Sequence, residues 1–198
     1  MKLIILLLTL ISISEIAYGQ KDTFDINQRA SYMCTRPLIL DSTKTSLTSR
    51  KVFFLFDLEN SSTNLRSQGI QRVDYPAAYI MAYLVNTSDS TFIAERQDRS
   101  LIMIQEALDE KKNWEPIEYW SPSSCGLSYQ NPLLLESGKY VMVPIKKYSG
   151  SFRTRIRLKF KYGDEVLYSD SFEGSVNKAQ FKKITDEFNL PVSYLNKK

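Results

Sequence analysis

The sequence predicts an all-β protein made of antiparallel strands. Short apolar runs separated by polar turns recur between residues 52 and 172, which is the pattern of all-β proteins. The chain has 12 tyrosines and 10 phenylalanines, residue types that favour strands. After Gly174 the apolar spacing becomes helical. We therefore expect a β-sandwich domain over residues 20–176, with a short helix and tail over 177–198 packed on it.

Residues 1–19 have the composition of a secretory signal peptide. Lys2 supplies the positive start, residues 3–13 form the apolar centre, and the small residues Ala17 and Gly19 mark a cleavage site. The apolar centre is well short of the ~20 residues needed to span a bilayer. We therefore expect a secreted or periplasmic protein that has no membrane span and whose mature chain starts after Gly19.

Nine segments have the apolar density and flanking turns of strands. They are 52–58, 78–85, 91–95, 101–108, 114–120, 133–135, 140–145, 152–162 and 166–172. Segment 101–108 would also suit a helix, because Leu101, Ile104 and Leu108 fall on one helical stripe. The polar turn at 109–113 favours a strand instead.

The turn after residue 162 decides which side chains of the next strand face the core. A two-residue loop would place Leu167 among polar neighbours on the face of Phe160. A three-residue loop, 163–165, would place Val166, Tyr168 and Phe172 there. Since a one-residue slip exchanges the two faces, the hydrophobic pattern predicts the longer loop.

The C-terminal helix is predicted from its start signals and from one apolar stripe. Asn177 can cap the helix and Gln180 stands at its third position, as in a capping box. Phe181, Ile184 and Phe188 form a narrow apolar stripe. We expect this stripe to pack on the sandwich.

Cys34 and Cys125 are the only cysteines of the chain. An exported protein meets an oxidising compartment, so we expect a disulfide between them. Two unpaired thiols are the alternative, because the sequence does not give the distance between them.

Three segments resemble the later strands of bacterial immunoglobulin-like domains. They are Trp114-Glu115-Pro116-Ile117, the stretch 135–140 and the stretch 149–153. Residues 100–181 resemble uncharacterised secreted proteins of Gram-negative bacteria, a similarity that covers less than half of the chain. The resemblance implies an immunoglobulin-like antiparallel β-sandwich and brings no known activity.

The composition excludes several chemistries. The chain has no histidine, which removes Ser-His-Asp and Cys-His catalysis and the commonest metal ligand. No glycine-rich phosphate loop or nucleophile elbow is present. We therefore expect no catalytic residue, no metal and no cofactor.

A carbohydrate-binding or carbohydrate-active cleft is the alternative to a non-catalytic protein. Glu115 and Glu118 lie close to Trp114, Tyr119 and Trp120, and a pair of carboxylates is sufficient for glycoside hydrolysis. Against this alternative, the two carboxylates would face opposite sides of a strand, and tryptophans in a sandwich are usually in the core.

The charge of the chain is segregated. Between Gly138 and Gly163 there are eight cations and no acid, although the whole chain has a net charge of only +4. Five of these cations alternate with Thr154, Ile156, Leu158 and Phe160, and alternation places them on one face of a strand. They are Arg153, Arg155, Arg157, Lys159 and Lys161.

This basic strand has three interpretations. It can be a solvated outer face that prevents edge pairing. It can dock on anionic glycans or lipopolysaccharide through charge steering and arginine pairing. Nucleic-acid binding is the weakest interpretation, because Phe152 and Phe160 would point inward and could not stack on bases.

The function that we expect is an exported, non-catalytic binding or cell-envelope interaction module. Its partner would be an anionic glycan or envelope component recognised by the basic strand. If acids of the neighbouring strands pair with most of the five cations, the basic strand loses this meaning.

Overall fold

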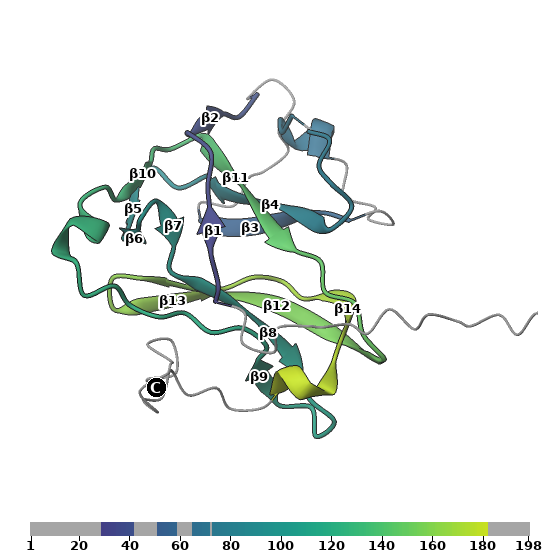
Figure 1. Cartoon of the computed structure of the whole chain (residues 1–198). Helices are drawn as coiled ribbons and strands as arrows, with labels where there is room; N and C mark the ends of the chain where they lie inside the picture. The colour runs from purple at the N-terminus through teal and green to yellow at the C-terminus, as the bar shows by residue number, and fades with distance from the viewer. Residues whose placement is uncertain (1–28, 42–50, 59–64, 72, 182–198) are drawn as a thin grey trace, which may run out of the picture.

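The computed structural model describes residues 29–41, 51–58, 65–71 and 73–181, and within them the protein is built of antiparallel strands (Figure 1). The strands are β1 (Tyr32–Met33), β2 (Leu38–Ile39), β3 (Val52–Asp57), β4 (Tyr79–Asn86), β5 (Phe92–Ala94), β6 (Arg96–Gln97), β7 (Ser100–Leu101), β8 (Met103–Leu108), β9 (Trp114–Pro116), β10 (Leu133–Leu135), β11 (Lys139–Lys146), β12 (Phe152–Tyr162), β13 (Glu165–Tyr168) and β14 (Phe172–Val176). Three single 3₁₀ turns accompany them: η1 (Leu65–Gln68), η2 (Gly126–Tyr129) and η3 (Lys178–Phe181). The all-β prediction is confirmed.

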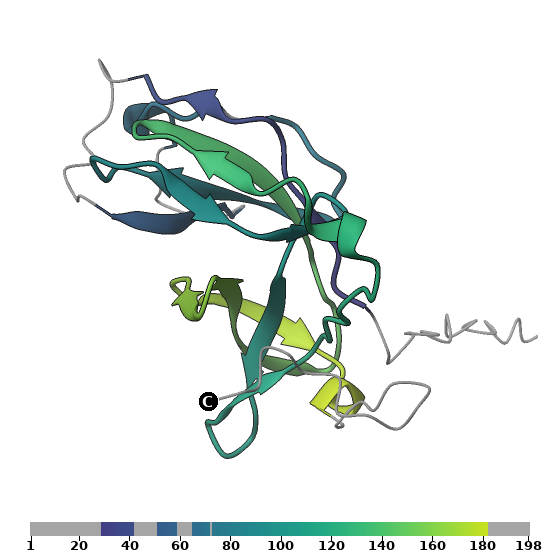
Figure 2. The same ribbon diagram turned by 90° about the vertical axis from the view of Figure 1, so that its left-hand side faces the viewer.

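Two large sheets form the layers of the molecule. One has the order β2-β11-β4-β3, and the other has the order β13-β12-β8-β9, with β14 paired to the other end of β12. Figure 2 shows the two sheets as separate layers. Two small sheets, β1-β7-β6 and β10-β5, complete the described strands. The result is a sandwich-like arrangement of antiparallel sheets.

Aromatic rings from the two large sheets meet in the core. Alternation along β3 directs Phe54 and Phe56 toward the other sheet, where they contact Phe160 of β12 and Phe172 of β14. The ring centroids lie 5.9 and 4.9 Å apart, a separation typical of favourable aromatic pairs.

A second apolar cluster covers the opposite face of the β2-β11-β4-β3 sheet. It includes Met81, Tyr83 and Val85 of β4, packed with Leu65 of η1. Strand β4 is therefore buried on both faces. This explains why the sequence of β4 is continuously apolar rather than alternating.

Most of the expected strands are present, with small differences at their ends. The segment 101–108 is a strand and not a helix, interrupted at Ile102. The segment 114–120 is a strand only at 114–116. The two-residue strands β1, β2 and β6 were not predicted, because such short pairings leave no periodic pattern.

The predicted three-residue loop after Tyr162 is wrong. Tyr162 pairs with Glu165, so the loop consists of Gly163 and Asp164 alone. The φ angle of Gly163 is +55°, as type II′ hairpin turns require at their first position. Leu167 is therefore the residue that lies opposite Phe160.

A β-bulge between β13 and β14 keeps the core apolar despite the shorter loop. Lys159 pairs with Tyr168, whereas Ile156 pairs with Phe172. Between these two pairs, the segment from β13 to β14 has three residues, 169–171, and β12 has two, 157 and 158. The Ser169 hydroxyl accepts a hydrogen bond of 2.8 Å from the Leu158 backbone N–H. The extra residue returns Phe172 to the inner face and leaves Tyr168 outside.

The chain passes from one large sheet to the other at Gly150, between β11 and β12. A Cβ atom at this position would lie 2.2 Å from the Val176 carbonyl carbon, so only glycine fits. The Gly150 backbone N–H donates to the Ser175 hydroxyl at 3.2 Å. This corner therefore joins the β11–β12 connection to β14.

The predicted cap residues of the C-terminal helix make their hydrogen bonds, but the described residues form only the single 3₁₀ turn η3. The Asn177 side chain accepts from the Ala179 N–H, and the Gln180 side chain accepts from the Asn177 N–H, both at 2.9 Å. The bond to Gln180 is the reciprocal bond of a capping box, and the bond from Ala179 is an N-cap bond to the second residue of the turn. Phe181 packs edge-on against Phe152, with ring centroids 5.8 Å apart. The rest of the predicted helix, 182–198, lies outside the described residues, as does the predicted signal peptide.

The predicted disulfide between Cys34 and Cys125 is wrong, because both thiols are free. Cys34 is half-buried beside the core, and its Sγ accepts from Arg96 Nη1 at 3.6 Å. Cys125 is exposed at the start of η2. The number of cysteines and the expected compartment indicated that a bridge was possible but did not give the geometry that a bridge needs.

Within the described part of the chain, no helix has the length and apolar character needed to cross a membrane.

Candidate functional site

The five cations of the basic strand lie on the outer face of β12, as predicted. Ile156, Leu158 and Phe160 alternate with them and are buried in the core. The alternation of apolar and charged residues was therefore sufficient to predict their direction.

The middle of the basic strand is paired with a buried acid. Glu106 of β8 lies directly opposite Arg157 in the register, and its side chain is only 5% exposed. Arg157 donates from Nε and Nη2 to Glu106 Oε2 at 2.9 and 2.7 Å. Lys159 Nζ lies 3.3 Å from the other carboxylate oxygen. One carboxylate thus serves two cations.

The Arg157 guanidinium is also enclosed by two aromatic rings. It lies 4.3 Å from the Trp114 ring centroid and 4.1 Å from the Tyr168 ring centroid. Both distances are well within the ~6 Å range of cation–π attraction. With its charge paired and its two faces covered, Arg157 serves to hold β9, β12 and β13 together.

Two further cations are bound near the ends of the strand. Arg155 donates to the hydroxyl and carbonyl oxygens of Ser171 at 2.8 and 2.7 Å, and it lies 3.9 Å from Glu173. Lys161 Nζ donates to the Gly163 carbonyl oxygen at 2.7 Å. Among the described residues, acids therefore pair with at least three of the five cations: Arg155, Arg157 and Lys159.

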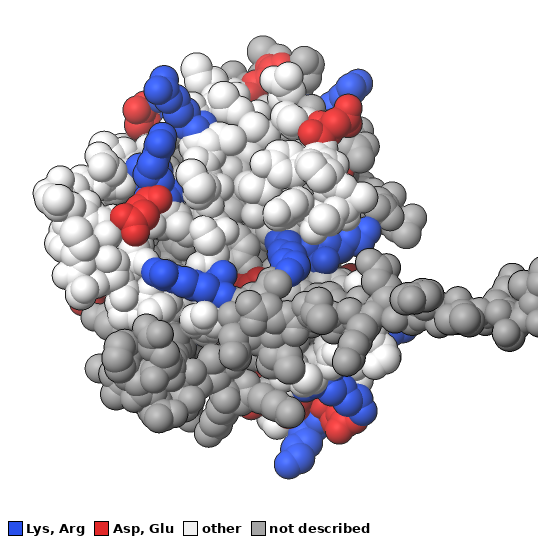
Figure 3. Space-filling view, in the orientation of Figure 1, with Lys and Arg blue, Asp and Glu red and all other residues white. Residues whose placement is uncertain are grey.

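The predicted continuous cationic surface is consequently broken. Figure 3 shows cations and acids interspersed over the described part of the face that it presents. Because acids pair with most of the five cations, the outer face of β12 does not present the continuous docking surface that the sequence predicted.

Arg153 differs from the other four cations. Among the described residues its side chain makes no hydrogen bond or ion pair, and Arg153 is exposed. Instead it lines a pocket at the edge of β14. In the register Arg153 lies opposite Ser175, which lines the same pocket.

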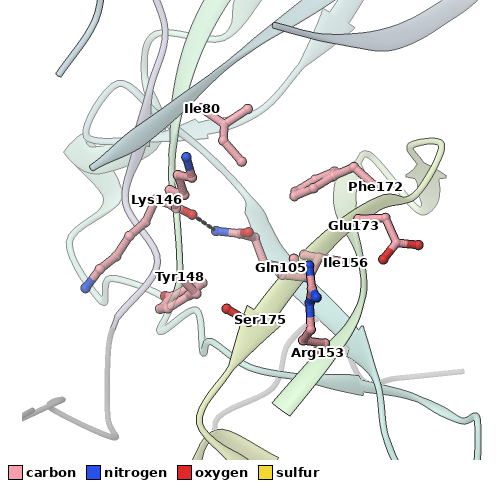
Figure 4. A pocket seen from close by; sticks show the side chains of 11 residues that line it. Ile80, Gln105, Lys146, Tyr148, Arg153, Ile156, Phe172, Glu173 and Ser175 are labelled. Atoms are coloured by element: carbon pink, nitrogen blue, oxygen red, sulfur yellow. Dashed lines mark hydrogen bonds between the residues drawn. The ribbon is translucent and has the colours of Figure 1, made fainter. Parts of the chain in front are cut away.

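The pocket has a volume of about 200 Å³ and opens between the two large sheets, beside β14. Four consecutive residues of β14, 172–175, form one wall, and the end of β11 with the following residues 147–148 forms the facing wall. Figure 4 shows Phe172 and Ile80 pointing toward one another across it. Its remaining lining residues are Gln105, Lys146, Lys147, Tyr148, Arg153, Ile156, Glu173, Gly174 and Ser175.

The charged groups at the pocket are mainly cationic. Lys146, Lys147 and Arg153 line it together with one acid, Glu173. The Glu173 side chain is 81% exposed and paired with Arg155, and Figure 4 shows its carboxylate directed away from Gln105. The pocket therefore favours an anion.

Gln105 of β8 is a fully buried polar side chain in the wall of the pocket. Its amide nitrogen lies 3.0 to 3.1 Å from three acceptors: Tyr32 Oη, Glu118 Oε1 and the Lys146 carbonyl oxygen. These contacts fix which end of the amide is nitrogen. The other end, Oε1, is buried and has no hydrogen-bond partner among the described residues.

Behind the pocket lies the buried carboxylate of Glu118. It accepts from the hydroxyls of Tyr32 and Tyr148, from the Gln105 backbone N–H at 2.8 Å and from the Gln105 side chain. Burial raises the pKa of Glu118, although these hydrogen bonds oppose the shift. Burial and the nearby Glu118 carboxylate likewise raise the pKa of Tyr148. The network fixes Tyr148 and Gln105, two walls of the pocket.

The alternative aromatic cleft receives no support from the geometry. Trp120 is 3% exposed and belongs to the core, whereas Trp114 stacks on Arg157. Tyr119 lies beside Arg29 in an isolated β-bridge. Glu118 is buried and Glu115 lies half-buried in β9, so the two carboxylates do not face a common opening.

A second depression, with a volume of about 730 Å³, lies beside η1 and β2. Its charged lining consists of Asp41 and Arg66, which have opposite signs. Asp41 is also where the described part of this segment ends, so we assign no site there.

Sequence reasoning missed Gln105 and Ser175 as site residues. Gln105 carried a usable signal, since it is the one polar side chain among Met103, Gln105 and Ala107, the inward positions of β8. Ser175 carried none, because small polar residues are common on strand surfaces.

The described residues contain no group of three histidine, cysteine or carboxylate side chains that could hold a metal ion. Comparison of the chain with protein-family models, with curated proteins and with solved structures gives no match. The resemblance to secreted immunoglobulin-like proteins therefore stays a prediction.

Proposed function

We propose that this protein is a non-catalytic binding protein that holds a small anionic ligand in the pocket at the β14 edge, with Arg153 as the main anion-binding residue. The observation that carries the proposal is the contrast along β12. Arg155, Arg157 and Lys159 are paired with acids, whereas Arg153 has no such partner among the described residues and lines the pocket.

The proposed anion-binding site is one position, Arg153, and not an extended basic surface. A guanidinium group binds carboxylate or phosphate through two parallel hydrogen bonds, which are stronger than bonds between neutral groups. Lys146 and Lys147 add positive potential beside it. An anionic glycan or another envelope component fits this chemistry, and the predicted signal peptide would bring the protein to such ligands.

The test compares two variants of the mature protein on an array of anionic glycans and lipids. Arg153→Gln should weaken binding by about tenfold or more, because a hydrogen bond to a charged group contributes roughly 1.5–3 kcal/mol. Lys161→Gln is the matched control, since it removes one charge from the same face of β12 at the opposite end. It should bind like the wild-type protein.

The same measurement at high salt provides a second criterion. Binding through an exposed guanidinium must weaken as salt screens the charges. Equal binding by Arg153→Gln and the wild-type protein, or binding that does not respond to salt, would overturn the proposal.

A further inference from the structure

We infer that the ligand of this pocket is a hydroxylated carboxylate of the sugar-acid class, in which a hydroxyl group donates to Gln105 Oε1 while the carboxylate binds Arg153. This inference rests on the proposed function and adds the class of ligand. It starts from the unpartnered Oε1 atom, which the proposed function does not use.

The orientation of the Gln105 amide is determined by its surroundings. Three acceptors, including the Glu118 carboxylate and the Lys146 carbonyl oxygen, lie within 3.1 Å of the nitrogen. Reversing the amide would place its oxygen against all three, so Oε1 must occupy the other position. Figure 4 shows Gln105 among the pocket side chains, with its nitrogen bonded to Lys146.

A buried acceptor without a donor is rare in folded proteins, because it has lost its water without replacement. Gln105 is 0% exposed and lines the pocket. The part of the chain that the structure describes provides no donor for Oε1. We take the pocket that Gln105 lines as the route by which a donor reaches this atom.

The remaining walls restrict what that donor can be. Arg153, Lys146 and Lys147 disfavour an ammonium group, so the donor is neutral, and a hydroxyl is the simplest choice. Ser175 lines the same pocket, and its hydroxyl accepts from Gly150 while its own proton remains available for the ligand. Ile80, Ile156 and Phe172 provide apolar contact for a carbon skeleton.

The size of the pocket limits the ligand to a single small unit. About 200 Å³ is below the roughly 300–1,000 Å³ of pockets that hold drug-sized molecules. One sugar ring is of suitable size. A carboxylate, several hydroxyls and an apolar ring face are together the chemistry of a uronic acid.

The experiment is a titration of the mature wild-type protein at low salt, by calorimetry, with three probes. Glucuronate has the carboxylate and the hydroxyls, tetrahydropyran-2-carboxylate has the carboxylate and the ring alone, and glucose has the hydroxyls without the charge. Glucuronate should bind at least about tenfold more tightly than either of the others, since a site built around a hydroxyl rejects ligands that lack it.

Each other outcome has a distinct meaning. Equal binding of glucuronate and tetrahydropyran-2-carboxylate would overturn the sugar-acid inference but leave anion binding intact. Equal binding of glucuronate and glucose would overturn the role of the carboxylate as well. If neither glucuronate nor any anionic array ligand binds, the proposed function itself fails.

A variant gives an independent check of Gln105. Gln105→Met retains the length of the side chain and removes Oε1, and circular dichroism verifies that it folds. It should bind the two carboxylates about equally. A preference for glucuronate that survives in folded Gln105→Met would overturn the assigned role of Oε1. If the variant does not fold, the three probes on the wild-type protein alone test the sugar-acid inference.

Discussion

Arg157 shows how one residue changes meaning when its neighbours are known. In the sequence it is the central cation of a basic strand. In the structure its charge is paired with Glu106 and its faces are covered by Trp114 and Tyr168. It stabilises the outer face of the sheet instead of offering a free charge to a partner.

Arg157→Lys should therefore destabilise the protein although it retains the charge. A lysine cannot reproduce the two hydrogen bonds that Nε and Nη2 of Arg157 donate to Glu106 Oε2, or the stacking on the two rings. We therefore expect a loss of about 1–2 kcal/mol in the free energy of unfolding. Urea denaturation measures this loss. Arg155→Lys, at a half-exposed side chain, serves as the control and should change stability by less than about 0.5 kcal/mol. Equal losses in the two variants would contradict this role of Arg157.

The buried Glu118 carboxyl group makes the free energy of unfolding depend on pH. Its pKa is raised above the ordinary value of 4.5, so the folded protein keeps this proton at a pH where the unfolded chain has lost it. The free energy of unfolding must then fall as the pH rises from about 4.5 toward the raised pKa.

Glu118→Gln should remove this pH-dependent contribution, because the amide does not titrate. Urea unfolding across that pH range should show the wild-type protein losing stability relative to the variant as the pH rises. Glu95→Gln, at an exposed position, should retain the wild-type pH dependence. A constant difference between the wild-type protein and Glu118→Gln would contradict the raised pKa. The variant should also be less stable overall by about 1–3 kcal/mol, because an amide cannot accept from all of the surrounding donors.

At the scale of single residues, the sequence predicted which way the five cations point but not which residues they pair with. Strict alternation placed the five cations outward, since a strand exposes every second residue. It could not pair Arg157 with Glu106, which lies 51 positions earlier and whose relation to Arg157 depends on the register between β8 and β12.

At the scale of elements, the strand formed by β13 and β14 shows where hydrophobic patterning fails. The pattern correctly required Phe172 to face the core, but it reached that result with a longer hairpin loop and an unbroken strand. The protein uses a two-residue loop and adds the extra residue later, as a bulge at 169–171. Both solutions shift the register by one, so alternation alone could not separate them.

The two solutions differ in the position of Tyr168, and substitutions separate them. The bulge places Phe172 in the core at 5% exposure and Tyr168 outside at 45%. We expect Phe172→Ala to cost about 3–5 kcal/mol in the free energy of unfolding. Tyr168→Ala should cost only about 0.5–1 kcal/mol, the range for a cation–π contact at an exposed site. Similar large losses, measured by urea denaturation, would indicate that both rings are in the core.

Other elements were predictable because their signals are local. Residues 152–162 form a strand with the predicted bounds, and the capping pair of Asn177 and Gln180 is present. The candidate pocket was not predictable, because its walls come from β4, β8, β11, β12 and β14, which only the folded chain brings together.

For the whole molecule, free thiols mean that the fold is stable without a covalent crosslink. A chain of this size buries enough surface to build its core unaided. We expect the melting temperature of the mature protein to be the same with and without a reductant such as dithiothreitol. The exposed Cys125 should react with a thiol reagent in the folded protein, whereas Cys34 should react more slowly. A clear drop of the melting temperature on reduction would contradict the free-thiol state.

The corner at Gly150 has a consequence for recognising related proteins. Backbone atoms of Val176 and Asn177 occupy the space where any side chain at this position would begin. Distant relatives can exchange most core residues for others of similar volume, but none can place a larger residue here without moving the connection between the two sheets. A glycine about 26 positions before the end of β14 is therefore a landmark by which homologues can be aligned when overall similarity has faded.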